Sequence, residues 1–181
     1  MTGITLTRLS EEDRNQFVLD NQRAFKYGAM EEFGTRDDHF EEDGEIISRQ
    51  TIEASIDEGL AFRIREDGRI VGGLVVTIDE KTGHNHLDLL FVNPEEHSKG
   101  IGFAAWKEVE RLFPETLVWE TCTPYFETRN IHFYVNKCGF HIVEFFNSKH
   151  PDPNDPESGS YSERESKEDF SGMFRFEKQM K

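Results

Sequence analysis

The chain has 181 residues and a formal net charge of −15, and apolar residues make up 35% of it. The length fits one domain, 1–181, that buries a core. The negative charge argues against nucleic acid as a partner, because its phosphates would be repelled, and it favours cationic ligands. Two cysteines are too few for a disulfide framework. No apolar stretch is long enough for a signal peptide or a membrane span, so no membrane partner is expected. We therefore expect a cytoplasmic protein.

The first third of the chain predicts one strand and two helices. Ile4 to Leu9 fits a strand, and Ser10 is a candidate N-cap for a helix that runs to about Phe25 and stops at Gly28. The acidic stretch 30–45 is either a solvated loop or a surface that faces a substrate. A second helix is expected from Glu45 to Glu58.

The middle of the chain changes to a period of two residues, which predicts three consecutive antiparallel strands. They are expected at 60–65, 69–79 and 84–92, with a hairpin turn at Asp67-Gly68. A polar loop with two glycines follows, and then a helical pattern runs to Pro114.

The loop between the third strand and this helix has the properties of an anion site. Gly100 and Gly102 have no side chain, so a ligand can approach the backbone, and the first helical turn offers unpaired N–H groups. The helix dipole adds partial positive charge, which suits a pyrophosphate. The alternative is a tight turn without a ligand.

The last third predicts a short strand at 117–121 that runs parallel to the preceding strand. A short helix capped by Gly139 and a strand at 140–146 come next. The proline-rich, acidic stretch 148–168 is expected to be an exposed loop, and 173–178 is expected to be the final strand.

Two segments resemble the GCN5-related N-acetyltransferase (GNAT) family. His97-Ser98-Lys99-Gly100-Ile101-Gly102, after Val92-Asn93-Pro94, is similar to the acetyl-CoA-binding motif Gln/Arg-x-x-Gly-x-Gly/Ala, with His97 in the first position. Phe133-Tyr134 followed by Gly139-Phe140 is similar to Phe/Leu-Tyr-x-x-x-Gly-Phe with one additional residue. The resemblance implies an α/β (α+β) fold with a mixed, twisted, mostly antiparallel sheet, flanked by helices and splayed at the acyl-CoA site.

The resemblance also implies a set of cofactor-binding residues for acetyl-CoA, which is the co-substrate, and no metal. Main-chain groups of Leu90, Phe91 and Val92 would bind the pantetheine, to which Asn130 is a further candidate contact. The pyrophosphate loop comprises His97, Ser98, Lys99, Gly100, Ile101, Gly102 and Phe103. Tyr134 matches the tyrosine that acts as general acid near the cofactor sulfur.

Acyl transfer to an amine needs a neutral amine and a proton for the departing thiolate. Tyr134 with an ordinary pKa of ~10 could donate that proton, or it could simply pack on its helix. His86, Asp88 and Glu120 are candidate bases. His86 could equally be a solvated strand residue, and water can relay the proton, so a dedicated base is optional. Cys122 shows no thiol-catalysis pattern, and the histidines lack a third metal ligand.

The sequence therefore predicts an acetyl-CoA-dependent N-acetyltransferase that acts on a primary amine. A cationic acceptor such as a polyamine, an aminoglycoside or a lysine side chain fits the charge. A homodimer is left open. The alternative is a non-catalytic acyl-CoA-binding or protein-interaction domain on the same fold.

Overall fold

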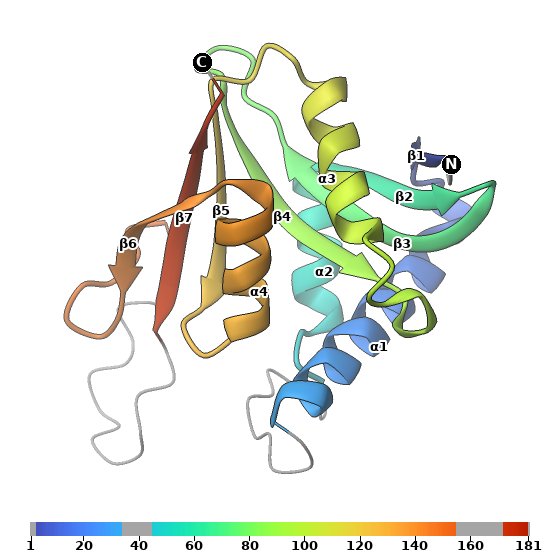
Figure 1. Cartoon of the computed structure of the whole chain (residues 1–181), viewed down its shortest axis with the longest axis horizontal. Helices are drawn as coiled ribbons and strands as arrows, with labels where there is room; N and C mark the ends of the chain where they lie inside the picture. The colour runs from blue at the N-terminus through green and yellow to red at the C-terminus, as the bar shows by residue number, and fades with distance from the viewer. Residues whose placement is uncertain (1–2, 34–44, 155–171, 181) are drawn as a thin grey trace. The chain divides into compact units, whose positions relative to one another are not determined.

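The computed structural model describes residues 3–33, 45–154 and 172–180 (Figure 1). The chain forms two compact units, 1–117 and 118–181, which are described separately. The prediction of a single domain stays a prediction, and most of the acidic stretch 30–45 and of the loop 148–168 lies outside the described residues. Among the described residues, none of the helices has the length and apolar character needed to cross a membrane.

Unit 1 contains a four-stranded sheet in which each strand pairs antiparallel with the next. The strands are β1 (Ile4–Arg8), β2 (Leu60–Glu66), β3 (Arg69–Thr77) and β4 (His84–Val92). Apolar residues alternate along β4, where Leu87, Leu89 and Phe91 are buried. The predicted run of three antiparallel strands is confirmed, and β1 extends it.

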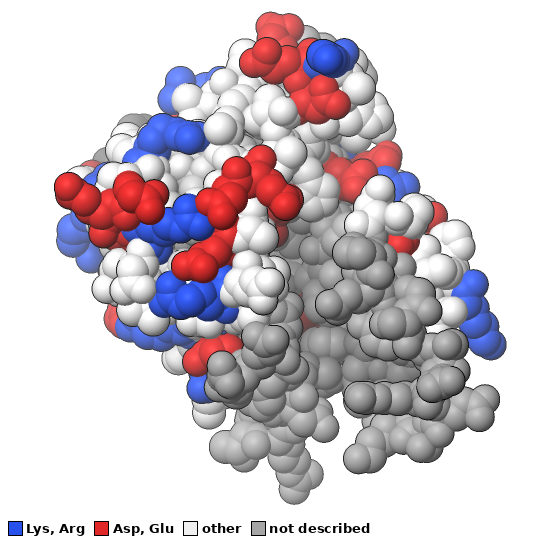
Figure 2. Space-filling view, turned by 180° about the vertical axis from the view of Figure 1, so that it is seen from behind, with Lys and Arg blue, Asp and Glu red and all other residues white. Residues whose placement is uncertain are grey.

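Helices cover both faces of this sheet. α1 (Arg14–Phe33) and α2 (Arg49–Glu58) lie behind the sheet in Figure 1, and α3 (Ile101–Leu112) lies in front of it. The core between α1, α2 and the sheet comprises Phe17, Val18, Ala24, Ile47, Ile52, Ala61, Val75, Leu89 and Phe91. The view from behind shows acidic and basic side chains interleaved over the side on which α1 and α2 lie (Figure 2). The net negative charge does not form one continuous patch in that view.

Two predicted helix boundaries were wrong. α1 continues past Gly28 to Phe33, because a single helical glycine costs only about 1 kcal/mol and Ala29 is buried beyond it. α2 begins at Arg49 instead of Glu45, because the hydroxyl of Ser48 caps the helix by accepting the Thr51 N–H at 3.1 Å.

Unit 2 is a three-stranded antiparallel sheet with a helical segment on one face (Figure 1). β7 (Met173–Gln179), the expected final strand, lies between β5 (Val118–Pro124) and β6 (His141–Phe146). α4 (Thr128–His132) continues directly into a π-helix, η4 (Phe133–Cys138). The parallel pairing predicted for the strand at 117–121 concerns the relation between the units and stays a prediction.

Candidate functional site

The loop between β4 and α3 takes the backbone into the left-handed region twice. A short 3₁₀ turn, η3 (Pro94–Glu96), is followed by Ser98 with φ 66° and Gly100 with φ 77°. Gly100 is the N-cap residue of α3, and a Cβ built there would meet no heavy atom within 4 Å. Glycine suits this position because its backbone is left-handed and because the space above it is open.

The N-terminus of α3 presents backbone donors beside this open space. Gly100 provides no side-chain cap, and its carbonyl accepts the first helical hydrogen bond from Ala104 N–H at 3.0 Å. The N–H groups of residues 101–103 are therefore the N-terminal donors of the helix. Together with the helix dipole they fit a phosphate-bearing group, such as the pyrophosphate of acetyl-CoA.

One carboxylate anchors positive charge next to this loop. Glu96 is buried, and its two oxygens accept hydrogen bonds from Lys99 Nζ at 2.6 Å and from Arg69 Nη1 at 2.8 Å. These bonds, with that of Lys99 the stronger, hold the pKa of Glu96 below its ordinary value. Lys99 remains half exposed although its ammonium group is paired with Glu96.

His97 does not extend into the loop but turns back onto the end of β4. Its Nε2 lies 2.8 Å from the Val92 carbonyl oxygen, and its ring packs edge-on against Tyr27 of α1 at 5.3 Å. His97 Nδ1 also lies 4.0 Å from a Glu31 oxygen. The imidazole thus connects α1 to the end of β4.

The last three residues of β4 combine core packing with their predicted main-chain role. Leu90, Phe91 and Val92 pair with Leu74, Gly73 and Gly72 of β3, in that order. The Phe91 ring packs edge-on against the α1 residue Phe17, with ring centroids 5.1 Å apart. Their contribution to pantetheine binding stays a prediction.

His86 and Asp88 are brought together on β4. His86 Nδ1 lies 2.7 Å from one oxygen of Asp88, and the hydroxyl of Thr77 donates to the other oxygen at 2.7 Å. A carboxylate that accepts a hydrogen bond from an imidazole nitrogen fixes the orientation of the ring. This pair has the arrangement of a general base and its orienting group.

Glu120, the third candidate base, belongs to an ion-pair network in unit 2. Arg175 of β7 donates to Glu120 at 3.1 Å, to Glu144 at 2.9 Å and to Glu177 at 2.6 Å. Cys122 stands opposite Arg175 in the strand register. Burial, followed by the charge of Glu120, raises the pKa of Cys122 to about 12, so the thiol is protonated near neutral pH.

Tyr134 is buried within unit 2. Its ring lies 5.6 Å from that of Phe140 and 5.7 Å from that of Phe176, and its hydroxyl is hydrogen-bonded to Thr121. Burial, followed by the neighbouring Cys138 thiol, raises the pKa of the phenol, which therefore keeps its proton at neutral pH. Asn130 on α4 is exposed, and its amide donates to Thr123 at 3.3 Å.

Comparison with known proteins places this arrangement in a family. The model of the acetyltransferase (GNAT) family matches residues 19–140. The chain belongs to the GNAT acetyltransferase family. The uncharacterized protein YrkN of Bacillus subtilis (strain 168) is 44% identical over 180 residues, which cover 98% of this chain and 94% of YrkN. Membership supports an acyl-CoA-dependent N-acetyltransferase in general terms.

Solved structures of GNAT enzymes share the fold over almost the whole chain. The ribosomal-protein-S18-alanine N-acetyltransferase of Escherichia coli has a TM-score of 0.65 at 14% identity, with coverage of 98% of this chain and 94% of that chain. The PaiA N-acetyltransferase of Thermoplasma acidophilum, in complex with coenzyme A, gives 0.62 at 16% identity and coverage of 98% and 99%. These likenesses confirm the predicted fold class.

The GNAT tyrosine motif is one residue longer here, and the π-helix accounts for that residue. Four residues separate Tyr134 from Gly139, and the Gly139 N–H bonds to the Tyr134 carbonyl five residues back, as in a π-helix. Gly139 then ends the segment in the left-handed conformation, φ 83°. The insertion is therefore taken up within η4, which lies directly before the glycine cap.

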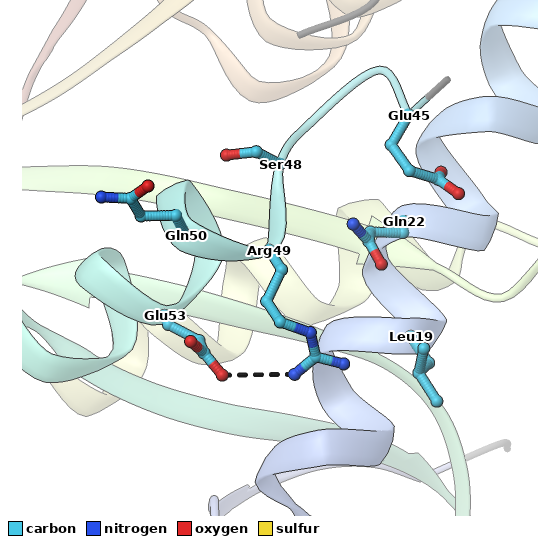
Figure 3. A pocket seen from close by; sticks show the side chains of 7 residues that line it. All are labelled: Leu19, Gln22, Glu45, Ser48, Arg49, Gln50 and Glu53. Atoms are coloured by element: carbon cyan, nitrogen blue, oxygen red, sulfur yellow. Dashed lines mark hydrogen bonds and ion pairs between the residues drawn. The ribbon is translucent and has the colours of Figure 1, made fainter. Parts of the chain in front are cut away.

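A pocket of about 470 Å³ between α1 and α2 was missed by sequence reasoning (Figure 3). It is lined by Leu19, Gln22, Glu45, Ser48, Arg49, Gln50 and Glu53. Arg49 pairs with Glu53 at 3.2 Å, and Glu45 lies 3.9 Å from Lys26. No sequence signal identifies the pocket, because its lining comes from ordinary surface positions on two separate segments.

Proposed function

We propose that this GNAT chain transfers an acetyl group from acetyl-CoA to a primary amine by direct attack, with Tyr134 as general acid. The observation that carries the proposal is the α3 N-terminus, where left-handed Gly100 opens the backbone donors to an anion. Two similar GNAT structures, of 16% and 14% identity, hold coenzyme A or acetyl-CoA. Acetyl-CoA supplies the activated acetyl group and the leaving thiolate.

The loop residues would bind the co-substrate through their backbone. The amides at 98–103 would contact the pyrophosphate, with Lys99 adding a positive charge beside them. Main-chain groups of Leu90 to Val92 would bind the pantetheine, and His97 would keep the Val92 carbonyl in place through its 2.8 Å contact. Asn130 stays a candidate pantetheine contact.

Three groups of side chains are candidates for the proton movements. The His86–Asp88 pair would take the amine proton, directly or through water, and Glu120 is the other candidate base. Tyr134 would give its phenolic proton to the departing sulfur, because burial keeps that proton on the oxygen. Holding both reactants in place would contribute most of the remaining rate.

A cationic acceptor is favoured by charge. The chain has 36 acidic and 21 basic residues, which raises the local concentration of cations near its surface. Glu45 and Glu53 in the α1–α2 pocket provide carboxylates on the unit that carries the loop. One similar structure, a SpeG chimera of 12% identity, is a spermidine N-acetyltransferase by name.

The first test measures acetyl-CoA binding by calorimetric titration. The second measures turnover as release of the CoA thiol in the presence of each of a panel of primary amines. Tyr134→Phe should lower turnover by roughly 10² or more, the usual size of general-acid catalysis, without changing the Kd for CoA. A parent protein that binds acetyl-CoA but acetylates no amine would support the binding-domain alternative. A parent that does not bind acetyl-CoA would refute the proposal.

A further inference from the structure

We propose that Thr121 is a positioning residue for the acetyl transfer, because its hydroxyl donates a hydrogen bond to the Tyr134 oxygen and directs the phenolic proton toward the leaving sulfur. The inference rests on the proposed role of Tyr134. It concerns residues of unit 2 alone, and it gives a function to a buried polar side chain that core packing does not require.

The contacts around Thr121 fix its hydroxyl next to Tyr134. Thr121 lies in the middle of β5, is 2% exposed, and stands opposite Phe176 of β7 in the strand register. The same Phe176 ring packs against the ring of Tyr134, with centroids 5.7 Å apart. Thr121 and Tyr134 are therefore both neighbours of Phe176, the first through the strand register and the second through ring packing, and their side chains are hydrogen-bonded.

The backbone of Tyr134 is fixed as well. Its carbonyl accepts the N–H groups of Gly139 and of Phe140, the latter at 2.9 Å. With the main chain and the ring immobilised, rotation of the phenolic O–H is the freedom that remains. A donor on one side of the oxygen decides where that hydrogen points.

The groups that face Tyr134 explain why it needs such a partner. Phe140 and Phe176 pack against the Tyr134 ring, and burial and the neighbouring Cys138 thiol disfavour a tyrosinate. The Lys178 side chain lies against Gly139, at the end of the π-helix. Among the described residues, the Thr121 hydroxyl is the group that opposes burial and favours loss of the phenolic proton.

The proposed step is balanced. As the acyl carbon–sulfur bond breaks and its electron pair moves to sulfur, the Tyr134 O–H bond breaks and a sulfur–hydrogen bond forms. The negative charge left on the Tyr134 oxygen is stabilised by the Thr121 O–H donor. The proton removed from the amine returns to Tyr134 through solvent, so the enzyme is restored.

The test compares Thr121→Val, Thr121→Ser and Thr123→Val. Thr123 is a matched control, because it lies two residues along β5, is 3% exposed, and bonds to Asn130 instead of Tyr134. Thr121→Val should lower kcat about tenfold, leave KM for acetyl-CoA nearly unchanged and increase the solvent isotope effect on kcat. Thr121→Ser, which keeps the hydroxyl, should restore most of the turnover.

Combination with Tyr134→Phe separates this inference from the proposed function. Thr121→Val should add no further loss to Tyr134→Phe, whereas any effect of Thr123→Val should add to it. If Tyr134→Phe keeps full turnover, the proposed general acid is wrong. If Tyr134→Phe is impaired but Thr121→Val matches the parent, or if Thr121→Ser does not rescue, then the inference about Thr121 is wrong.

Discussion

The substitution Gly100→Ala tests the anion loop with a single methyl group. Gly100 has φ 77°, and nothing lies within 4 Å of the position of the new Cβ, so the methyl group meets no atom in the free protein. The cost is the left-handed backbone alone, about 1–2 kcal/mol for a non-glycine residue. In a chain of 181 residues this lowers the Tm by roughly 2–8 °C.

The effect on binding has a different origin. Backbone strain is present in both the free and the bound states, so it cancels from the Kd. The methyl group, however, occupies the open space beside the N-terminal amides of α3, where the pyrophosphate is expected. A hydrogen bond to a charged group contributes about 1.5–3 kcal/mol, so loss of one raises the Kd for acetyl-CoA about 10- to 100-fold.

Gly68→Ala is the matched control. Gly68 has φ 86° in the hairpin between β2 and β3 and also has nothing within 4 Å of a built Cβ. It should lose as much stability as Gly100→Ala and keep the parent Kd in calorimetric titration. If Gly100→Ala also keeps the parent Kd, or if both variants lose affinity equally, the loop is not the pyrophosphate site.

Three further predictions concern buried or partly buried side chains. With a pKa of about 12, Cys122 should react with iodoacetamide at pH 8 on the order of 10³-fold more slowly than a free cysteine. The rate should rise tenfold per pH unit. Fast alkylation of Cys122, located by mass spectrometry, would contradict the raised pKa. Arg63 is 1% exposed and donates hydrogen bonds to Asp13 at 2.6 Å and to Asp20 at 2.9 Å. Arg63→Met leaves these carboxylates unpaired and should lower the free energy of unfolding, measured in urea, by about 3–5 kcal/mol. A change below about 1 kcal/mol would show that the carboxylates are solvated. Asn21 is fully buried, and its side-chain amide has no hydrogen-bond partner among the described residues. Asn21→Leu should therefore raise the free energy of unfolding by up to about 1–3 kcal/mol. A loss of stability would show that the amide is hydrogen-bonded.

The strand, loop and helix from β4 to α3 could be predicted from the sequence because every signal for them is local. An apolar strand that ends at Asn93-Pro94, glycines at fixed spacing and a helical apolar pattern all lie within about two dozen residues. The end of α1 was not predictable in the same way. Gly28 has the ordinary signature of a helix stop, but Tyr27 packs against His97, a residue 70 positions away in the sequence.

The surroundings of the candidate catalytic residues depend on strand register, which the sequence does not specify. Arg175 meets Glu144 and lies opposite Cys122 only because β7 pairs with both β5 and β6 in the observed alignment. In the sequence of each strand, these side chains occupy ordinary alternating polar positions, which do not indicate their partners on the neighbouring strands. The Thr121–Tyr134 bond is hidden for the same reason, since it joins a strand to a helix across the interior of unit 2.

The π-helix changes how the irregular tyrosine motif should be interpreted. In an α-helix, the additional residue between Tyr134 and Gly139 would turn the later residues by about 100°. The π-helix takes up this residue in its wider hydrogen-bond ring, and Tyr134, Cys138 and Phe140 all remain buried. Two of the four intervening residues, Asn136 and Lys137, are exposed, which is where an added residue disturbs packing least. The longer spacing is therefore no argument against Tyr134, and turnover of the Tyr134→Phe variant is the measurement that separates enzyme from binding domain.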